Sequence, residues 1–200
     1  MAEAGCEAVF SDNLSNSNLS VPDRLESFTS KCLSFIEGDV RDTIKLQESV
    51  KAHQIDAVIY LVGLKAVGES ADKPIEYCDN NIVGMVSLLK AKRAADVKTL
   101  VFCISAAVYG DPQYVPLDEM HPASATNPYG RSSPHVEEMF ADVANSDVSR
   151  CIACLRYFNP VGPHDSGLIA EDLYDIPNNL TPYFTQVASG KLPELNVFGG

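Results

Sequence analysis

The chain has 200 residues, 46 % of them hydrophobic and 21 % charged, which suits one globular domain or one domain with part of a second. A formal net charge of −12 argues against polyanionic partners, so we expect neither nucleic-acid binding nor attachment to an anionic membrane. The sequence has no long apolar run and no secretory signal, and we therefore expect a cytoplasmic protein whose six cysteines are reduced thiols.

The first part of the chain alternates short apolar runs with polar turns. Residues 7–10 predict a strand that ends in a turn, and residues 13–20 predict a polar loop. Residues 32–36 predict a second strand. Helical spacing over residues 43–53, with Asp42 as its cap, predicts the first helix.

The middle of the chain continues the alternation with longer elements. Residues 57–62 are continuously apolar, which predicts a parallel strand covered on both faces. A long buried helix is predicted over residues 81–95, and a further strand over residues 99–104. Residues 129–143 predict a helix interrupted at Pro134, because a proline beyond the first turn removes a hydrogen bond and clashes with the preceding turn.

The last predicted strand covers residues 151–155, after which proline and glycine become frequent. Strands that alternate with helices imply a parallel α/β sheet with right-handed crossovers. We therefore expect one α/β domain over residues 1–158 and the beginning of a second region over residues 159–200.

Cysteines and histidines give no sign of a metal site. Cys151 and Cys154 have metal-like spacing, but strand residues three apart face opposite sides, so we expect core thiols. The histidines lack ligand spacing and are expected at the surface or in loops; they are His53, His121, His135 and His164. Glu137 and Glu138 fit the exposed face of a helix.

Five short motifs occur in order along the chain. They are GLKAVGES at residues 63–70, SAAVYG at 105–110, NPYG at 127–130, RYFNP at 156–160 and IPNNL at 176–180. Together they resemble the UDP-galactose 4-epimerases, sugar-nucleotide members of the extended short-chain dehydrogenase/reductase family. The resemblance implies a Rossmann-like doubly wound parallel sheet, an NAD cofactor, and interconversion of UDP-galactose and UDP-glucose in galactose metabolism.

The resemblance also implies a set of binding residues at the carboxyl ends of the strands. For NAD these are Asp12, Asn13, Leu14, Ser15, Asn16, Ser17, Asp39, Val40, Leu61, Val62, Gly63, Lys65, Asn80, Ser105, Tyr129 and Phe158. For the UDP-sugar they are Lys65, Ser105, Tyr129, Asn159, Asn179, Leu180, Asn196 and Phe198. Asp12 would accept hydrogen bonds from the adenine ribose, and Phe158 would lie near the nicotinamide.

The family chemistry removes a proton from the sugar 4-hydroxyl while hydride leaves C4, and the 4-keto sugar rotates before hydride returns. Ser105 and Tyr129 match the positions that share this proton. Either residue could instead be an ordinary strand-end serine or helix-start tyrosine, but their joint match favours the inherited site.

Two departures from the family pattern bear on activity. The family motif is Tyr-x-x-x-Lys, whereas Ser133 stands four residues after Tyr129, and Arg131 points elsewhere on a helix. A tyrosine with a pKa near 10 is about one-thousandth ionised at pH 7, a handicap of about 4 kcal/mol. The glycine-rich loop that binds the pyrophosphate, and the central first strand before it, have no counterpart before Asp12. We therefore expect an inactive or severely impaired epimerase.

Other functions stay open on the sequence alone. The chain would then be a non-catalytic subunit, as a homodimer or as a heterodimer with an intact epimerase, or a truncated product without function. The related 4,6-dehydratases need an acidic pair beside the serine. Ala106 and Ala107 occupy those positions, which excludes that reading.

Overall fold

The computed structural model describes residues 4–29, 33–167 and 180–196. It separates into a larger unit (Val9–Asn13 and Ser34–Phe158) and a smaller unit (Met1–Ala8, Leu14–Leu33 and Asn159–Gly200).

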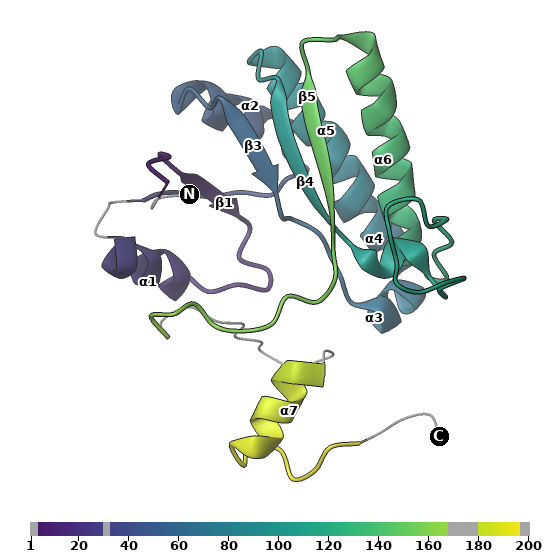
Figure 1. The fold of residues 1–200 in the computed structure, drawn as a ribbon. Helices are drawn as coiled ribbons and strands as arrows, with labels where there is room; N and C mark the ends of the chain where they lie inside the picture. The colour runs from purple at the N-terminus through teal and green to yellow at the C-terminus, as the bar shows by residue number, and fades with distance from the viewer. Residues whose placement is uncertain (1–3, 30–32, 168–179, 197–200) are drawn as a thin grey trace. The chain divides into compact units, whose positions relative to one another are not determined.

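All strands of the larger unit are parallel and form two sheets (Figure 1). Strand β1 (Val9–Asp12) pairs with β2 (Ser34–Glu37). Strands β3 (Ala57–Tyr60), β4 (Thr99–Ser105) and β5 (Cys151–Tyr157) form the other sheet in the order β3-β4-β5. The predicted parallel α/β class is confirmed. Among the described residues β1 and β3 each have a partner on one edge only, as expected without a central strand.

Strand β3 corrects the prediction of a doubly covered strand over residues 57–62. It ends at Tyr60, and Ile59 is 42 % exposed while Tyr60 is 3 % exposed. Only the side of β3 that faces the helices is therefore covered. Leu61 and Val62 leave the sheet and begin the following loop, where Leu61 is 74 % exposed.

The helix between β2 and β3 begins at a local cap. Helix α2 (Thr43–Ala52) begins after Asp42, whose side chain accepts a hydrogen bond from the Lys45 amide at 3.0 Å, as predicted. The predicted helix over residues 81–95 corresponds to α5 (Gly84–Ala94) and to the end of the π-helical turn (Asp79–Val83) that precedes it. Two short helices, α3 (Val67–Asp72) and α4 (Pro74–Cys78), come before this turn.

Helix α6 (Pro128–Ser146) is continuous through Pro134, so the predicted interruption is wrong. Its N-cap is Asn127, which accepts a hydrogen bond from the Gly130 amide at 2.8 Å. Val136 and Phe140 are each 2 % exposed, and their burial offsets the hydrogen bond that Pro134 cannot donate.

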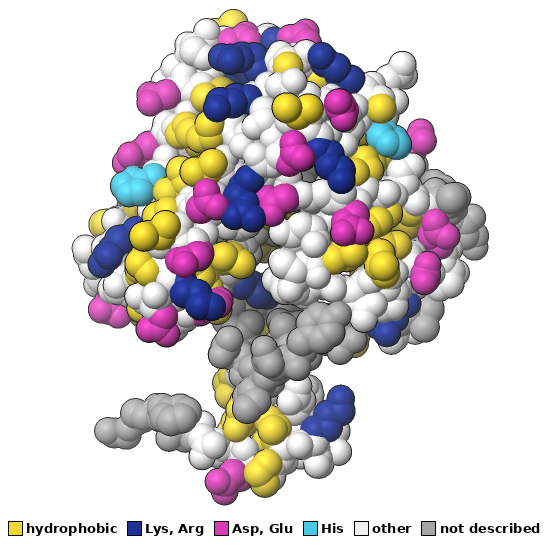
Figure 2. Space-filling model, turned by 180° about the vertical axis from the view of Figure 1, so that it is seen from behind, with side chains coloured by type: hydrophobic (Ala, Val, Ile, Leu, Met, Phe, Trp, Pro, Cys, Tyr) yellow, Lys and Arg dark blue, Asp and Glu magenta, His cyan; other side chains and the backbone are white. Residues whose placement is uncertain are grey.

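The core of the larger unit lies on the helical side of the sheets. Leu100, Phe102 and Ile104 alternate inward from β4, where α5 and α6 cover them (Figure 1). Phe102 meets Phe140 edge-on, with 5.1 Å between ring centroids. Figure 2 shows acidic, basic and apolar side chains interspersed on the face seen there, where the described residues gather no basic patch.

The smaller unit contains α1 (Ser20–Thr29) and α7 (Leu180–Ala188), neither of which was predicted. Helix α1 follows the predicted polar loop, and the Asn18 side chain accepts a hydrogen bond from the Ser20 amide at 2.9 Å. No helix in the described part of the chain combines the length and hydropathy needed to cross a bilayer.

Candidate functional site

The first part of the site is the loop that follows β3, held by a buried asparagine from the π-helical turn. Asn81 is 8 % exposed, donates to the Leu64 carbonyl at 3.0 Å and accepts from the Leu64 amide at 2.9 Å. The Asn80 side chain donates to Asn81 at 3.0 Å. These bonds fix the loop that carries Leu61, Val62, Gly63 and Lys65, all four of them exposed. π-helical turns occur often at functional sites.

Tyr77 anchors the same loop from α4. Its hydroxyl accepts a hydrogen bond from the Ala66 amide at 3.1 Å and lies 3.0 Å from a Glu69 carboxylate oxygen. Burial, with Glu69 adding to it, raises the pKa of Tyr77 to about 12, so this phenol stays protonated at neutral pH. The Tyr77 ring meets the Tyr129 ring edge-on, at 6.5 Å between centroids.

The predicted pair Ser105 and Tyr129 comes together at the carboxyl end of β4. Ser105 is the last residue of β4, and its hydroxyl accepts from the Ala107 amide at 3.2 Å. The Ser105 hydroxyl lies close enough to the Tyr129 phenol to act on the pKa of that phenol. Burial raises the pKa of Tyr129 above its ordinary value, and the nearby Ser105 hydroxyl opposes that rise without cancelling it.

A glycine lets the first turn of α6 approach the 3₁₀ turn after β4 (Ala106–Tyr109). A Cβ on Gly130 would lie 2.8 Å from the Ala107 carbonyl oxygen and 2.9 Å from the Ala125 side chain, closer than such atoms pack. This approach positions Tyr129 beside Ser105.

Ser133 is 5 % exposed on α6, at the position where the family motif has lysine. Arg131 is exposed, and its guanidinium lies 3.4 Å from the Thr126 carbonyl oxygen, to which it donates a hydrogen bond.

A charged cluster follows β2. Arg41 donates to both carboxylate oxygens of Asp39, at 2.8 and 2.7 Å, and contacts Asp79 at 2.5 Å. The hydrogen bonds from Arg41, with one from Asn13 at 3.2 Å, hold the pKa of Asp39 well below its usual range. The side chain of Val40, also predicted to border the adenine, packs in the core.

The remaining predicted residues are distributed between the units. Asp12 ends β1 in the larger unit, and its carbonyl accepts from the Gly38 amide at 2.9 Å. The smaller unit contains the predicted residues Leu14, Ser15, Asn16, Ser17, Asn159, Leu180 and Asn196. Asn179 and Phe198 lie outside the described residues.

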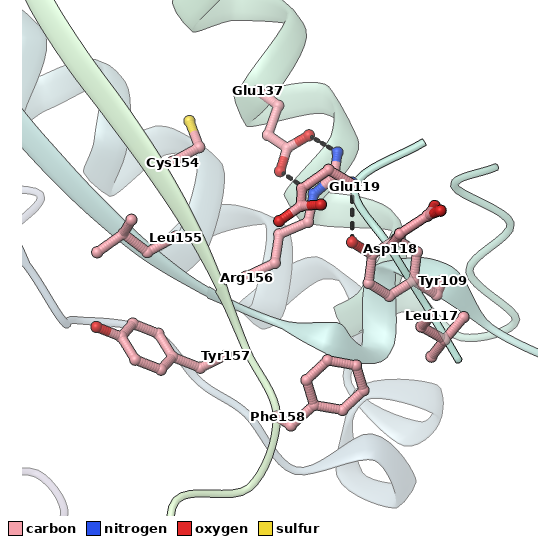
Figure 3. A pocket seen from close by; sticks show the side chains of 10 residues that line it. All are labelled: Tyr109, Leu117, Asp118, Glu119, Glu137, Cys154, Leu155, Arg156, Tyr157 and Phe158. Carbon is pink, nitrogen blue, oxygen red and sulfur yellow. Dashed lines mark hydrogen bonds and ion pairs between the residues drawn. The ribbon is translucent and has the colours of Figure 1, made fainter. Parts of the chain in front are cut away.

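A cavity of about 600 Å³ lies beside the end of β5 and is lined in part by Phe158 (Figure 3). Arg156 donates to the two carboxylate oxygens of Glu137 at 2.9 and 2.6 Å, and its guanidinium lies 5.2 Å from the Tyr109 ring centroid. The Phe158 ring stacks on the Tyr109 ring, with 6.5 Å between the ring centroids. Neither Ser105 nor Tyr129 is among the residues that line the cavity.

Several residues differ from the sequence prediction. Cys151 and Cys154 are exposed rather than in the core, because no described strand covers the outer side of β5. His121 is 3 % exposed, although it does lie in a loop, and it accepts from the Gln113 amide at 2.9 Å. Glu137 is part of the ion pair rather than an exposed carboxylate. Among the described residues, no group of three or more side chains is placed to hold a metal ion.

The roles of Asn81 and Tyr77, and the ion pair of Glu137 with Arg156, were not predicted from the sequence. The available signal for Asn81 was a polar residue at the start of an otherwise apolar helical pattern.

Comparisons with known proteins cover nearly the whole chain. The model of the NAD dependent epimerase/dehydratase family matches residues 1–199. The chain is 46 % identical to a UDP-glucose 4-epimerase of Neisseria gonorrhoeae and 50 % identical to one of Dictyostelium discoideum, in each case over 100 % of this chain. It covers 60 % and 58 % of those two proteins, so it spans about three-fifths of the length of the curated relatives it matches.

Two solved structures are similar to this fold. One is the UDP-glucose-4-epimerase from Stenotrophomonas maltophila with bound NAD and formylated UDP-arabinopyranose, at a TM-score of 0.95 and 44 % identity, over 98 % of this chain and 59 % of that one. The other is the UDP-glucose 4-epimerase from Bifidobacterium longum in complex with NAD+ and UDP, at a TM-score of 0.91 and 45 % identity, over 96 % and 57 %.

Proposed function

The chain belongs to the NAD dependent epimerase/dehydratase family, and from this we propose that it is a UDP-glucose 4-epimerase-like protein with a severely impaired proton-transfer site. The observation that carries the proposal is the position four residues after the half-buried Tyr129. There Ser133 stands where the family has lysine, and no cation among the described residues opposes the burial that raises the pKa of Tyr129.

The residues at the carboxyl ends of β1, β2 and β3 fit a dinucleotide in part. Asp12 ends β1, Asn13 follows it, and Asp39 follows β2. A carboxylate such as that of Asp12 can accept hydrogen bonds from ribose hydroxyls. The loop after β3, which Asn81 holds through the backbone of Leu64, exposes Gly63 and Lys65. We propose that these residues hold NAD, which when bound supplies the hydride acceptor for C4 of the sugar. On this proposal residues 1–158 bind NAD and residues 159–200 begin the UDP-sugar region.

Within that site Tyr129 would take the proton of the sugar 4-hydroxyl, and Ser105 would share it. A base with a raised pKa is rarely ionised at pH 7, so less than about one-thousandth of Tyr129 is phenolate. The resulting barrier is higher by about 4 kcal/mol or more than for a fully ionised base. The substrates we propose are UDP-galactose and UDP-glucose.

The test is epimerisation by the purified chain. UDP-galactose and NAD are supplied at pH 7, and UDP-glucose is quantified against the Dictyostelium relative. We expect a rate at least about a thousandfold lower, which Tyr129→Phe reduces further. A rate within about tenfold of the relative would refute the impairment.

A second candidate is a subunit that associates with an intact epimerase or with a second copy of itself. Exposed apolar side chains on α3, α4 and the π-helical turn favour it: Val67 is 50 % exposed, Ile75 79 % and Val83 47 %. Co-expression with the Dictyostelium relative, followed by size-exclusion chromatography, tests it. We expect a mixed dimer that Ile75→Asp dissociates, and exclusively separate elution of the unmodified proteins would contradict it.

A further inference from the structure

The buried side chain of Tyr77 joins two parts of the candidate site that are far apart in the sequence. Tyr77 lies on α4 and is 1 % exposed. Its hydroxyl contacts the loop after β3, and its ring contacts Tyr129 where α4 lies beside the beginning of α6 (Figure 1). A single side chain is therefore in contact with the loop that exposes Lys65 and with the tyrosine proposed to take the proton.

The hydroxyl of Tyr77 is held by the loop and by α3. It accepts a hydrogen bond from the Ala66 amide at 3.1 Å. It lies 2.9 Å from the Ala66 carbonyl oxygen and 3.0 Å from a Glu69 carboxylate oxygen, the two acceptors for its single proton. The Glu69 carboxylate is itself paired with Lys73 at 2.9 Å. Because both the donor and the acceptor roles of this hydroxyl are filled, the ring that carries it is held in one position.

The ring of Tyr77 covers part of Tyr129. The two rings meet edge-on with 6.5 Å between their centroids, an arrangement that aromatic pairs favour. Burial is the largest influence on the pKa of Tyr129 and raises it, and a ring packed against the phenol adds to that burial. The contact therefore acts on the position of Tyr129 and on its ionisation.

We propose that Tyr77 is a positioning residue for Tyr129. Its ring holds the phenol beside Ser105 and keeps water from one side of it, and the hydrogen bonds to Ala66 and Glu69 hold that ring in place. The use of this contact in proton transfer rests on the function proposed above. The contact itself needs neither NAD nor a UDP-sugar, so it can be tested in a chain without activity.

The test compares loss of the ring with loss of the hydroxyl. The full chain is labelled with ¹³C at the tyrosine Cζ atoms, and the titration of Tyr129 is followed by NMR without NAD or nucleotide sugar. Its signal is the one that disappears in Tyr129→Phe. Tyr77→Leu removes the ring and admits water, so the phenolate fraction of Tyr129 at pH 9 should rise about threefold or more. Tyr77→Phe keeps the ring and should change that fraction less than about 1.5-fold. An unchanged titration in Tyr77→Leu would overturn the proposal.

A general loosening of α6 is controlled by a matched variant. Phe140 is another buried aromatic residue, 2 % exposed, and it packs on Phe102 rather than on Tyr129. Phe140→Leu should lower the thermal unfolding midpoint and leave the titration of Tyr129 within about 1.5-fold of the unmodified chain. Equal changes in Phe140→Leu and Tyr77→Leu would assign the effect to lost stability and overturn the proposal.

The hydroxyl is tested separately through the loop. In Tyr77→Phe the Ala66 amide loses its acceptor, and its hydrogen exchange should become at least about tenfold faster, while the Leu64 amide keeps its bond to Asn81. Unchanged exchange at Ala66 would show that the hydroxyl does not hold the loop. One measurement needs no variant of Tyr77: nuclear Overhauser effects between the ring protons of Tyr77 and Tyr129 are expected in the unmodified chain, and their absence would overturn the proposal. Because none of these measurements uses a cofactor, their failure is distinguishable from failure of the proposed epimerase function.

Discussion

The substitution Ser133→Lys tests whether a missing cation limits Tyr129. Residues four apart on a helix are neighbours, so a lysine at this position of α6 lies on the same face as Tyr129. An opposite charge within about 4–6 Å lowers a pKa by about 1–3 units. Each unit raises the phenolate fraction tenfold, and we therefore expect epimerisation at pH 7 to rise by about 10- to 1000-fold.

The pH profile identifies the cause. Burial raises the pKa of Tyr129, so the rate of the unmodified chain should increase about tenfold per pH unit through pH 9, as the phenolate fraction does. In Ser133→Lys the rising limb should move to lower pH. UDP-glucose formation from UDP-galactose is followed with NAD between pH 6 and pH 9, under ionic strength held constant.

Bulk and charge are separated by a matched control. Ser133 is buried, and both Ser133→Lys and Ser133→Met add a long side chain to the same place. Only the lysine should shift the profile. The reasoning is refuted if Ser133→Lys retains the thermal unfolding midpoint of the unmodified chain and yet leaves the pH profile unchanged, or if Ser133→Met produces the same gain.

Three further predictions concern stability. Gly130→Ala should lower the free energy of unfolding by about 1–3 kcal/mol in urea, because its Cβ would lie 2.8 Å from the Ala107 carbonyl oxygen; an unchanged midpoint would contradict this. Burial lowers the pKa of Lys92 to about 8. The unfolded chain then binds more protons above pH 8, so stability should rise between about pH 8 and pH 10.5 by about 3 kcal/mol, and a rise that persists in Lys92→Met would refute this assignment. Gly84→Ala would bring a Cβ within 2.5 Å of the side chain of Val40, which lies just beyond β2. Hydrogen exchange should therefore show the β1–β2 sheet losing protection before β4, and equal loss of protection in both would contradict this prediction.

The strands were predictable because apolar runs are local, whereas their ends were not. The apolar run over residues 57–62 continues beyond Tyr60, but the chain leaves the sheet there. Helix α6 was assigned an interruption by a local rule on Pro134, which the burial of Val136 and Phe140 overrides. Helix α1 was missed because Pro22 and a serine-rich start obscure its pattern.

In the site, Ser105 and Tyr129 were predicted because each lies in a short motif of the family, and the structure adds that the two side chains lie close together. The residues that hold the site in place were not predicted, because their partners are distant in sequence. Asn81 bonds Leu64 17 residues away, and Arg156 bonds Glu137 19 residues away. No periodicity of a single element records such a pairing.

The larger unit holds together across the interruption between β1 and β3 because helices, not strands, bridge it. Helix α2 packs against α5, and the Ser87 hydroxyl of α5 donates to the Arg41 carbonyl at 3.3 Å. Val40, just beyond β2, joins the same core as Tyr60 at the end of β3. The facing edges of β1 and β3 are therefore not what joins the two sheets. Side-chain packing keeps the polar loops at the carboxyl ends of β2 and β3 in place. A candidate site at those ends can persist without a continuous sheet beneath it, provided that the helical layer stays intact.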